Sequence, residues 1–350
     1  MENDVICLKS IDKTTIMEKT RVLVTGAYGN LGYLTVLKLF KTPNVEITCF
    51  GRKSKNGIRK QKKLSKKGKF KTVWGDIRDS EAVKEAVKGQ DVIIHMAALL
   101  VPKTEDNPEL GHDINVNGLI NIIGAAENLD PKPRFIFSSS VACMGPASPD
   151  LPPRKVTDPL IAVNVYGKTK IEGEKLLQES QLPWVILRIS LSPPFVVSDY
   201  MMKYLFDIAV DQKVEFIDPR DTAEAFVNAI FVPDDQILGK TMFLGGGEKC
   251  RLTQGDFLKK QFGSMGIPML PREAFFMPKS LEDWHFMHWL DTEESQRLLD
   301  YQNRTLDDYI EEYLKGIGFK RHIIKLLGKQ AVGQFLKASP YYEEQSNIRA

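Results

Sequence analysis

The chain has 350 residues, of which 43% are hydrophobic and 27% are charged, and its formal net charge is +3. This composition is typical of a soluble globular protein with one large or two smaller domains. The net charge is too small to indicate a nucleic-acid partner. No apolar run approaches the ~18 residues of a transmembrane helix, so a membrane partner is not expected either.

The first 19 residues mix charged and apolar side chains without a continuous apolar core. They predict no signal peptide and therefore, by default, a cytoplasmic protein. Because Met17 stands shortly before the first expected strand, residues 1–16 are either a ragged extension or an additional segment. Four cysteines lie scattered without a CxxC spacing, so neither a disulfide framework nor a zinc site is expected: Cys7, Cys49, Cys143 and Cys250.

The first organised stretch is a β-type run at residues 21–25 that ends in three glycines and leads into a helical pattern. Such a turn can place a diphosphate on a helix N-terminus, where unpaired N–H groups and the helix dipole favour anions. We expect Gly26 to make the turn, Gly29 to let the diphosphate approach and Gly32 to let the helix pack on the strand. A purely structural turn is the alternative. The other turn residues assigned to the cofactor are Tyr28, Asn30 and Leu31.

A second strand is expected at residues 45–50, and Gly51-Arg52-Lys53-Ser54 follows it. In a dinucleotide fold this strand end meets the adenosine ribose, where an acidic residue would accept hydrogen bonds from the hydroxyls of NAD. No acidic residue stands here, and Arg52, Lys53 and Ser54 supply cationic and hydroxyl donors suited to a 2′-phosphate. NADP(H) is therefore favoured as the cofactor, with NAD(H) as the alternative, and a solvated basic loop as the non-functional interpretation.

The basic run continues to Lys71 without an acidic residue. Such a run is usually a solvated, mobile surface, although it can also steer an anionic cofactor or substrate toward a site. Phe70 is its only aromatic residue, so nucleic-acid binding is the weakest interpretation.

Two more strands are expected before the middle of the chain. Residues 72–79 contain a short strand, with Asp79 as the N-cap of the following helix. The buried strand at residues 91–98 ends in Ala97 and Ala98, whose small side chains leave space beside a bound cofactor.

Polar groups on three further segments follow, and the serines among them stand at the carboxyl end of a strand, where a parallel sheet binds ligands. An apolar helix carrying Asn115 leads to a strand that ends in the hydroxyl cluster Ser138-Ser-Ser140. After a Pro-rich loop, Tyr166 and Lys170 lie one turn apart on an amphipathic helix. A tyrosine has a reference pKa of about 10, and a nearby ammonium favours its phenolate, so this pair suits acid–base chemistry.

Beyond the strand at residues 184–189 the regular alternation weakens, after Ser192-Pro-Pro-Phe195. The remaining pattern predicts a helix through Tyr204–Ala209, a strand at Val214–Ile217, a helix at Arg220–Ile230, a strand and turn at Thr241–Gly247, and a helix at Thr253–Met265.

The histidines do not indicate a metal site. His95 lies within an apolar run and is interpreted as a packed core residue. His285 and His288 could share a helix face, but no carboxylate motif completes a metal site, and residues 283–290 are expected to form a core helix or an apolar wall of a substrate pocket.

Taken together, these motifs resemble the extended short-chain dehydrogenase/reductase family, which includes NAD-dependent epimerases and dehydratases, 3β-hydroxysteroid dehydrogenases and dihydroflavonol-reductase-like enzymes. The resemblance covers about residues 20–310 and rests on motifs in the family's order: Thr25-Gly-x-x-Gly-x-x-Gly32, Gly75-Asp-Ile77, His95-x-Ala-Ala98, Asn115-Val-Asn-Gly118, Ser138-Ser-Ser140 and Tyr166-x-x-x-Lys170. Later segments also look like family landmarks: Leu187-Arg-Ile189, Arg220-Asp-Thr-Ala223 and Leu244-Gly-Gly-Gly247.

The resemblance implies a catalytic set of serine, tyrosine and lysine. Tyr166 would be the general acid/base, Lys170 would lower its pKa and hold the nicotinamide ribose, and Ser140 would hydrogen-bond the substrate carbonyl. Ser139 is the alternative serine. Asn115 would support the proton transfer without touching the substrate itself. The resemblance also assigns cofactor contacts to Asp76 and Ile77 beside the adenine, to Ala97 and Ala98, and to Ser138.

Two departures from the family pattern bear on the reaction. Sugar 4,6-dehydratases resemble one another in an acidic pair directly after the catalytic hydroxyl residue, whereas Val141-Ala-Cys-Met144 follows Ser140 here. Dehydration by that route is disfavoured. Met144 also replaces the tyrosine that is common before the next glycine, which predicts a more apolar substrate-side wall, together with Phe195 and Trp284.

The predicted fold is therefore an α/β Rossmann fold, a doubly wound parallel sheet with a smaller C-terminal α+β substrate domain. The expected division is an N-terminal extension (1–19), a dinucleotide-binding domain (20–190, sharing core elements with 214–245), a mainly substrate-binding part (191–335) and a flexible tail (336–350).

The leading functional prediction is an NADP(H)-dependent oxidoreductase that transfers hydride between nicotinamide and a carbonyl/alcohol carbon of a small molecule. The alternative is a nucleotide-sugar epimerase with tightly bound NAD, and the third is a non-catalytic NADP-sensing protein. Because family members often dimerise through the helix that carries the tyrosine and its neighbour, the resemblance also suggests a homodimer.

Overall fold

The structure is a computed structural model that describes residues 19–195 and 205–342. The expected N-terminal extension up to residue 18, Cys7, Tyr204 and residues 343–350 of the expected tail lie outside the described residues. Within them, no helix combines the length and the apolar character needed to cross a membrane.

A seven-stranded sheet forms the centre of the molecule, and every neighbouring pair in it is parallel. Its order places β1 and β4 side by side at the point where the chain reverses direction across the sheet. The strands lie in the order β3 (Lys71–Trp74), β2 (Val45–Gly51), β1 (Thr20–Thr25), β4 (Val92–His95), β5 (Arg134–Ser140), β6 (Trp184–Ile189) and β8 (Lys240–Leu244).

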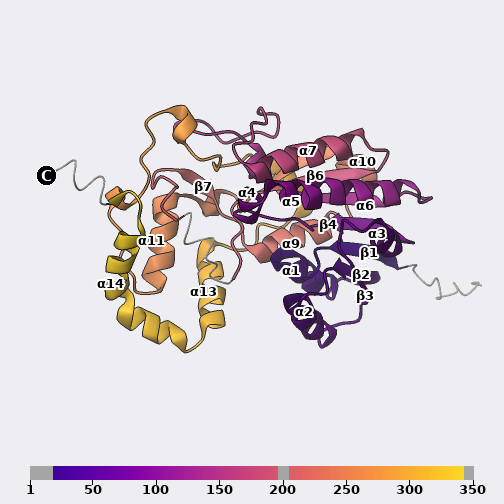
Figure 1. Cartoon of the computed structure of the whole chain (residues 1–350), viewed down its shortest axis with the longest axis horizontal. Coiled ribbons are helices and arrows are strands. Elements are labelled where there is room, and N and C mark those ends of the chain that lie inside the picture. Colours follow the sequence, from indigo (N-terminus) through magenta and orange to yellow (C-terminus); the bar gives the residue numbers. More distant parts are fainter. Residues whose placement is uncertain (1–18, 196–204, 343–350) are drawn as a thin grey trace, which may run out of the picture.

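Helices cover both faces of this sheet, because successive strand residues point to opposite sides and both sets are apolar. Val22 and Val24 belong to one core cluster and Leu23 to the other. The first face carries α1 (Asn30–Leu39), α2 (Lys55–Ser65), α9 (Pro219–Asn228), α10 (Asp234–Ile237) and α12 (Glu293–Leu299). The second carries α3 (Ser80–Val87), α6 (Gly118–Glu127) and α7 (Val165–Glu179) (Figure 1). The predicted doubly wound fold is confirmed.

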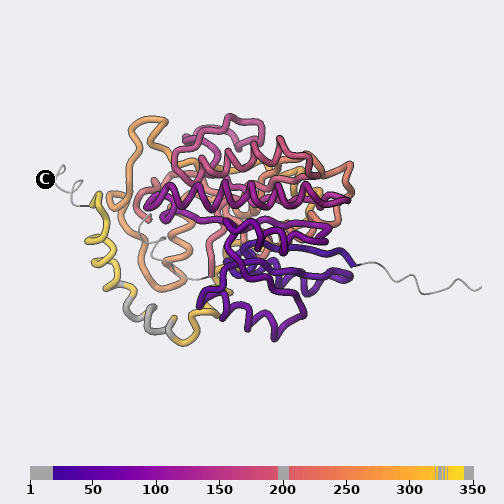
Figure 2. The backbone as a smooth tube through the Cα atoms, turned by 45° about the vertical axis from the view of Figure 1, so that its right-hand side comes forward, coloured from indigo at the N-terminus to yellow at the C-terminus, as the bar shows by residue number. Residues whose placement is uncertain are grey.

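A separate apolar cluster builds the smaller C-terminal part, in which aromatic side chains such as Phe216, Phe257 and Tyr309 pack together. Its elements are the antiparallel pair β7 (Lys213–Glu215) and β9 (Arg251–Thr253), with α11 (Gln254–Ser264), α13 (Leu306–Ile317) and α14 (Lys320–Ala338). Figure 2 shows α14 in yellow at the outer side of this part, far from the indigo N-terminal strands. The tail predicted from residue 336 thus begins within α14.

Local signals predicted several element boundaries well. The Asp79 carboxylate accepts hydrogen bonds from the backbone N–H of Glu81 (3.0 Å) and Ala82 (3.3 Å), so Asp79 is the N-cap of α3 as expected. Thr253 caps α11 in the same way. The helix predicted from Asn115 differs, because a π-helical turn at Asp113–Asn117 precedes α6.

Two helices that the sequence suggested do not form; for residues 283–290 the helix was one of two alternatives. Residues 284–290 run without a helix, because side chains from elsewhere bind their backbone: the Gln212 amide accepts from His285 N–H (2.8 Å) and donates to the carbonyl of Met287 (2.6 Å). Residues 205–209 also form bends rather than a helix, and Phe206 binds the backbone of Phe276. In both segments, tertiary contacts determine the backbone conformation, and the local helical pattern does not.

Candidate active site

The glycine turn between β1 and α1 has the close backbone approaches that its spacing predicts. Gly26 adopts φ +65°, and a β-carbon there would lie 2.8 Å from the amide nitrogen of Ala97 at the end of β4. A β-carbon on Gly32 would lie 2.2 Å from the Gly26 carbonyl oxygen, so only glycine lets α1 pack this closely on the turn. Gly29 is the N-cap of α1.

A cavity of about 280 Å³ opens at the carboxyl ends of β1, β2 and β4. Eight of the predicted cofactor residues line it: Gly26, Tyr28, Gly29, Arg52, Asp76, Ile77, Ala97 and Ala98. Seven others do not: Asn30, Leu31, Gly32, Lys53, Ser138, Tyr166 and Lys170. Ser54, expected as a hydroxyl donor to a 2′-phosphate, also lines it. The structure adds lining residues that the sequence interpretation missed, including Asn56 and Gly57 in the first turn of α2, and Leu99 and Ile114.

The cavity wall near β2 is cationic. Arg52 follows β2 directly, and the hydroxyl of Ser54 caps α2 by accepting from Gly57 N–H (3.0 Å). The carboxylate of Asp76 also lines this wall, but Arg78 binds both of its oxygens (2.9 Å each). That hydrogen bonding lowers the pKa of Asp76, so it stays charged and paired.

Lys60 is a further cation at this site, and its sequence neighbourhood does not distinguish it from the other lysines of the basic run. From α2 its Nζ donates to the carbonyl oxygen of Gly29 (2.8 Å) and lies 3.4 Å from the Asn30 Oδ1. Burial and the neighbouring Arg59 and Lys63 lower the pKa of Lys60. No carboxylate among the described residues pairs with it, so a half-buried ammonium lies beside the glycine turn without a counter-ion.

The predicted catalytic residues come together where β5 ends and α7 begins. Ser140 is the last residue of β5, and its Oγ accepts from Ala142 N–H (3.2 Å). Lys170 is only 4% exposed, and its Nζ donates to the Ser138 carbonyl (2.7 Å) while lying 5.6 Å from the centre of the Tyr166 ring. Burial lowers the pKa of Lys170 to about 8. Ser138 therefore contributes to the site through its backbone carbonyl, which binds Lys170.

Gly167 allows this proximity and was not assigned a role from sequence. A β-carbon at Gly167 would lie 2.3 Å from the carbonyl oxygen of Ala142, in the turn directly after Ser140. The first turn of α7 can therefore touch this turn only because residue 167 lacks a side chain. A glycine next to the tyrosine inside a helical pattern was the available signal.

Asn115 lies behind the site and is 4% exposed. Its Oδ1 accepts from Leu99 N–H (2.7 Å), and its Nδ2 donates to the Leu99 carbonyl and to the Thr169 hydroxyl (3.0 Å each). The Thr169 hydroxyl in turn donates to the Tyr166 carbonyl (2.8 Å). Asn115 therefore connects the cavity wall with the helix that carries the candidate acid/base.

The alternative serine, Ser139, has its hydroxyl committed elsewhere. It donates to the buried carboxylate of Glu174, which Arg188 binds through Nε (2.9 Å) and a terminal nitrogen (2.7 Å). Successive strand residues point to opposite faces, so Ser140 stays the candidate for the substrate contact.

The remaining candidate residues are structural. His95 is 1% exposed, and its Nδ1 lies 3.1 Å from the Thr25 hydroxyl. That hydroxyl already accepts hydrogen bonds from the N–H groups of Met96 (3.1 Å) and Ala97 (3.2 Å), so it donates its own hydrogen to His95 Nδ1. Burial lowers the pKa of His95 to about 3, which confirms a neutral core histidine. The described residues contain no group of three or more potential ligands that could hold a metal ion.

Met144 corrects the prediction of an apolar substrate wall. It is fully buried and packs with Val141, Phe243 and Leu290. It therefore supports the turn after Ser140 from behind and has no surface to offer a substrate. Phe195 stacks on Tyr309, with ring centres 5.0 Å apart.

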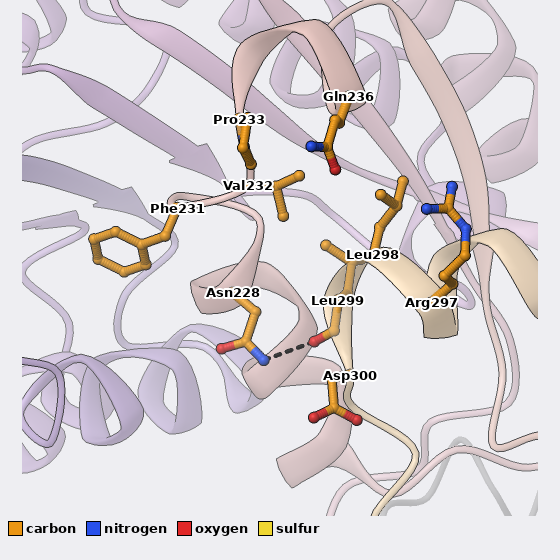
Figure 3. Close-up of a pocket in the computed structure, with 9 residues that line it drawn as sticks. All are labelled: Asn228, Phe231, Val232, Pro233, Gln236, Arg297, Leu298, Leu299 and Asp300. Atoms are coloured by element: carbon orange, nitrogen blue, oxygen red, sulfur yellow. Dashed lines mark hydrogen bonds between the residues drawn. The ribbon is translucent and has the colours of Figure 1, made fainter.

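A second hollow, of about 390 Å³, lies where the end of α9 meets α10 and α12 (Figure 3). The Asn228 side chain donates to the Leu299 carbonyl across it (2.7 Å). None of the predicted site residues lines this hollow.

Comparison with known proteins agrees with this geometry. The sequence model of the NAD dependent epimerase/dehydratase family matches residues 22–192, which include the glycine turn, the serine cluster, Tyr166 and Lys170. The match covers just under half of the chain. The predicted resemblance to NAD-dependent epimerases and dehydratases is confirmed over these residues.

The relatives of this epimerase/dehydratase segment match over a limited length. Uncharacterized epimerase/dehydratases of Staphylococcus saprophyticus and Staphylococcus haemolyticus are each 32% identical over 169 and 167 residues, which is 45% of this chain and 48% of theirs. The chain thus spans about half the length of the curated relatives that it matches.

Solved structures show the same fold over most of the chain. UDP-glucuronic acid 4-epimerase from Bacillus cereus, in complex with UDP-glucuronic acid and NAD, has a TM-score of 0.69 and 20% identity over 85% of this chain and 100% of its own. UDP-glucose-4-epimerase from Stenotrophomonas maltophila, with bound NAD, has a TM-score of 0.71 and 20% identity over 85% and 97%. At this identity the likeness shows the fold alone.

Proposed function

We propose that the protein is an NADP(H)-dependent oxidoreductase that transfers hydride between nicotinamide and the carbonyl/alcohol carbon of a small molecule. The observation that carries the cofactor choice is the cationic cavity wall: Arg52 and the first turn of α2 line it, and the carboxylate there is held by Arg78. A 2′-phosphate fits such a wall, whereas the ribose hydroxyls of NAD would favour a free acidic acceptor.

The residues present fit a dinucleotide in two further respects. The narrow approach at Gly26 and Gly29 leaves the N-terminus of α1 open to a diphosphate. Lys60, without a paired carboxylate, supplies a positive charge beside that turn, where an anionic group would be its counter-ion. Arg52, Ser54 and Asn56 would hold the 2′-phosphate.

In the proposed mechanism one catalytic residue transfers the proton and the other two stabilise the charges that develop. The bound nicotinamide would supply or accept the hydride at the substrate carbon. In the direction of reduction, the Tyr166 phenol donates its proton to the carbonyl oxygen as that oxygen gains charge, and Ser140 Oγ–H donates a hydrogen bond to the same oxygen. The Lys170 ammonium stabilises the phenolate that is left.

Binding and turnover test this proposal separately. A thermal-shift comparison should show stronger stabilisation by NADP⁺ than by NAD⁺ at equal concentration. NADPH should then be oxidised in the presence of at least one member of a panel of aldehydes and ketones. Equal stabilisation by both cofactors would contradict the NADP preference, and no turnover across the panel would contradict the reductase.

A nucleotide-sugar epimerase with tightly bound NAD is the second candidate. The family match and the fold shared with UDP-sugar epimerases favour it. An epimerase returns the hydride to the same substrate and keeps its cofactor, whereas a reductase exchanges its cofactor at every turnover. Absorbance of the purified protein for retained nicotinamide therefore separates the two candidates.

We further propose that residues 191–335 bind the substrate and that the chain forms a homodimer through α6 and α7. Ile120 on α6 is 46% exposed and would supply an apolar contact to such an interface. A dimer in light scattering that becomes a monomer in Ile120→Lys would support this interface, and a wild-type monomer would reject it.

A further inference from the structure

The segment from Leu99 to Asn107 joins the cofactor cavity to the catalytic helix. Its first residue, Leu99, lines the cavity, and both backbone polar groups of Leu99 are bound by the Asn115 side chain. The segment then forms the short helix α4 (Lys103–Asp106), which packs against α7. One continuous stretch therefore touches both halves of the site.

Glu105 of α4 makes the polar contact with α7. Its Oε2 accepts from Val165 N–H (3.1 Å) and its Oε1 from Tyr166 N–H (3.3 Å). The first N–H groups of a helix have no partner within the helix and need one from outside. The local N-cap, Asn164, serves only the third of them, on Gly167 (2.7 Å). A residue 60 positions earlier in the chain serves the other two.

We propose that Glu105 is a positioning residue that fixes the catalytic Tyr166 relative to the cofactor, an inference that rests on the proposed function. The Tyr166 backbone is bound on both sides, at its N–H by Glu105 and at its carbonyl by the Thr169 hydroxyl that Asn115 holds. Both connections lead back to the segment that lines the cofactor cavity. The segment from Leu99 to Asn107 therefore fixes the position of the Tyr166 backbone relative to the cofactor cavity.

The chemistry of this contact suits its role. A carboxylate binds the N-terminus of a helix better than a neutral acceptor does, because the helix dipole is positive there. Hydride and proton transfer both need reacting atoms at about 3–3.5 Å, and a displacement of about 1 Å can lower a rate ~100-fold. Glu105 touches neither substrate nor cofactor in this account and acts only through Tyr166.

The test compares three variants in the full chain: Glu105→Ala, Glu105→Gln, and Glu109→Gln as a control at an exposed carboxylate on the adjoining helix α5 (Pro108–His112). In Glu105→Ala we expect kcat to fall about tenfold while the Kd for NADP⁺ stays within about twofold, because Asn115 still holds Leu99. Glu105→Gln should recover part of the rate, because its amide oxygen can accept one of the two N–H groups. The control should behave as wild type.

Amide hydrogen exchange gives a readout that does not depend on turnover. Exchange at Val165 and Tyr166 should accelerate at least about tenfold in Glu105→Ala and less in Glu105→Gln. If Glu105→Ala fails to fold, Glu105→Gln carries both measurements. Unchanged kcat with unchanged exchange overturns the inference and leaves the proposed function intact. An inactive wild type overturns the proposed function, and exchange at these two amides then decides whether Glu105 positions the helix.

Discussion

At the glycine turn, contacts between main-chain atoms decide the geometry, whereas at α7 side chains from distant segments do the same work. Gly26 and Gly32 bring backbone within 3 Å of a would-be β-carbon. The first turn of α7 depends instead on Glu105 and, through Thr169, on Asn115. The geometry of the cofactor end thus depends on the missing side chains of glycines, whereas that of the catalytic end depends mainly on hydrogen bonds from side chains distant in the sequence.

The largest expected effect falls on the catalytic end alone. Tyr166→Phe removes the proton donor, and we expect kcat to fall by about 10²–10⁴-fold while the Kd for NADP⁺ is unchanged. Single-turnover oxidation of bound NADPH measures the chemical step directly. Full activity in this variant would contradict the assigned role.

Gly167 is the place where the catalytic end also depends on a missing side chain. Gly167→Ala puts a β-carbon 2.3 Å from the Ala142 carbonyl oxygen, so α7 must shift away from Ser140. We expect a loss of about 1–3 kcal/mol in the free energy of unfolding and a fall in kcat of ~10-fold or more. Denaturant unfolding and steady-state kinetics measure the two effects.

Gly333→Ala inside α14 is the matched control, because nothing lies within 4 Å of its added β-carbon. It should raise the free energy of unfolding by about 0.5–1 kcal/mol, as alanine favours a helix interior over glycine. Equal effects of the two substitutions would contradict the close approach at Gly167.

The pH dependence should also report the catalytic end. Lys170 has a pKa lowered to about 8 by burial, so it is charged below that pH and loses its proton as pH rises through it. The cation that favours the Tyr166 phenolate is then lost. We expect kcat/KM to fall by about tenfold per pH unit above pH 8. A profile that stays flat to about pH 9.5 would contradict this assignment.

The smallest effect should fall on the cofactor end alone. Lys60→Ala removes the ammonium beside Gly29, and we expect the Kd for NADP⁺ to rise about fivefold while kcat at saturating cofactor is unchanged. Lys62→Ala, an exposed lysine on the same helix, is the control. Equal changes in the two variants would show that only the general charge of α2 matters.

The sequence allowed prediction of features that depend on short-range spacing. The glycine turn, the Asp79 cap and the one-turn spacing of Tyr166 and Lys170 each involve residues only a few positions apart, so their pattern was visible. The fold followed from the alternation of apolar strands and amphipathic helices.

Features that depend on long-range side-chain contacts could not be predicted. Lys60 is one of many similar lysines, and only the path of α2 distinguishes it. Glu105 binds a helix 60 residues away, and nothing near it in the sequence marks that partner. Met144 has an apolar side chain that suits a substrate wall equally well, and only the packing of Phe243 and Leu290 assigns it to the core.

Thr25 limits which residues around the cofactor cavity can be changed in a redesign. Its side chain is fully buried between β1 and β4, where one hydroxyl oxygen serves the amides of Met96 and Ala97. An isosteric valine would keep the shape and leave both partly buried amides without that acceptor, at a cost of up to about 1–3 kcal/mol for each. Engineering of cofactor preference can therefore change the exposed side chain of Arg52, while Thr25 has to keep its hydroxyl.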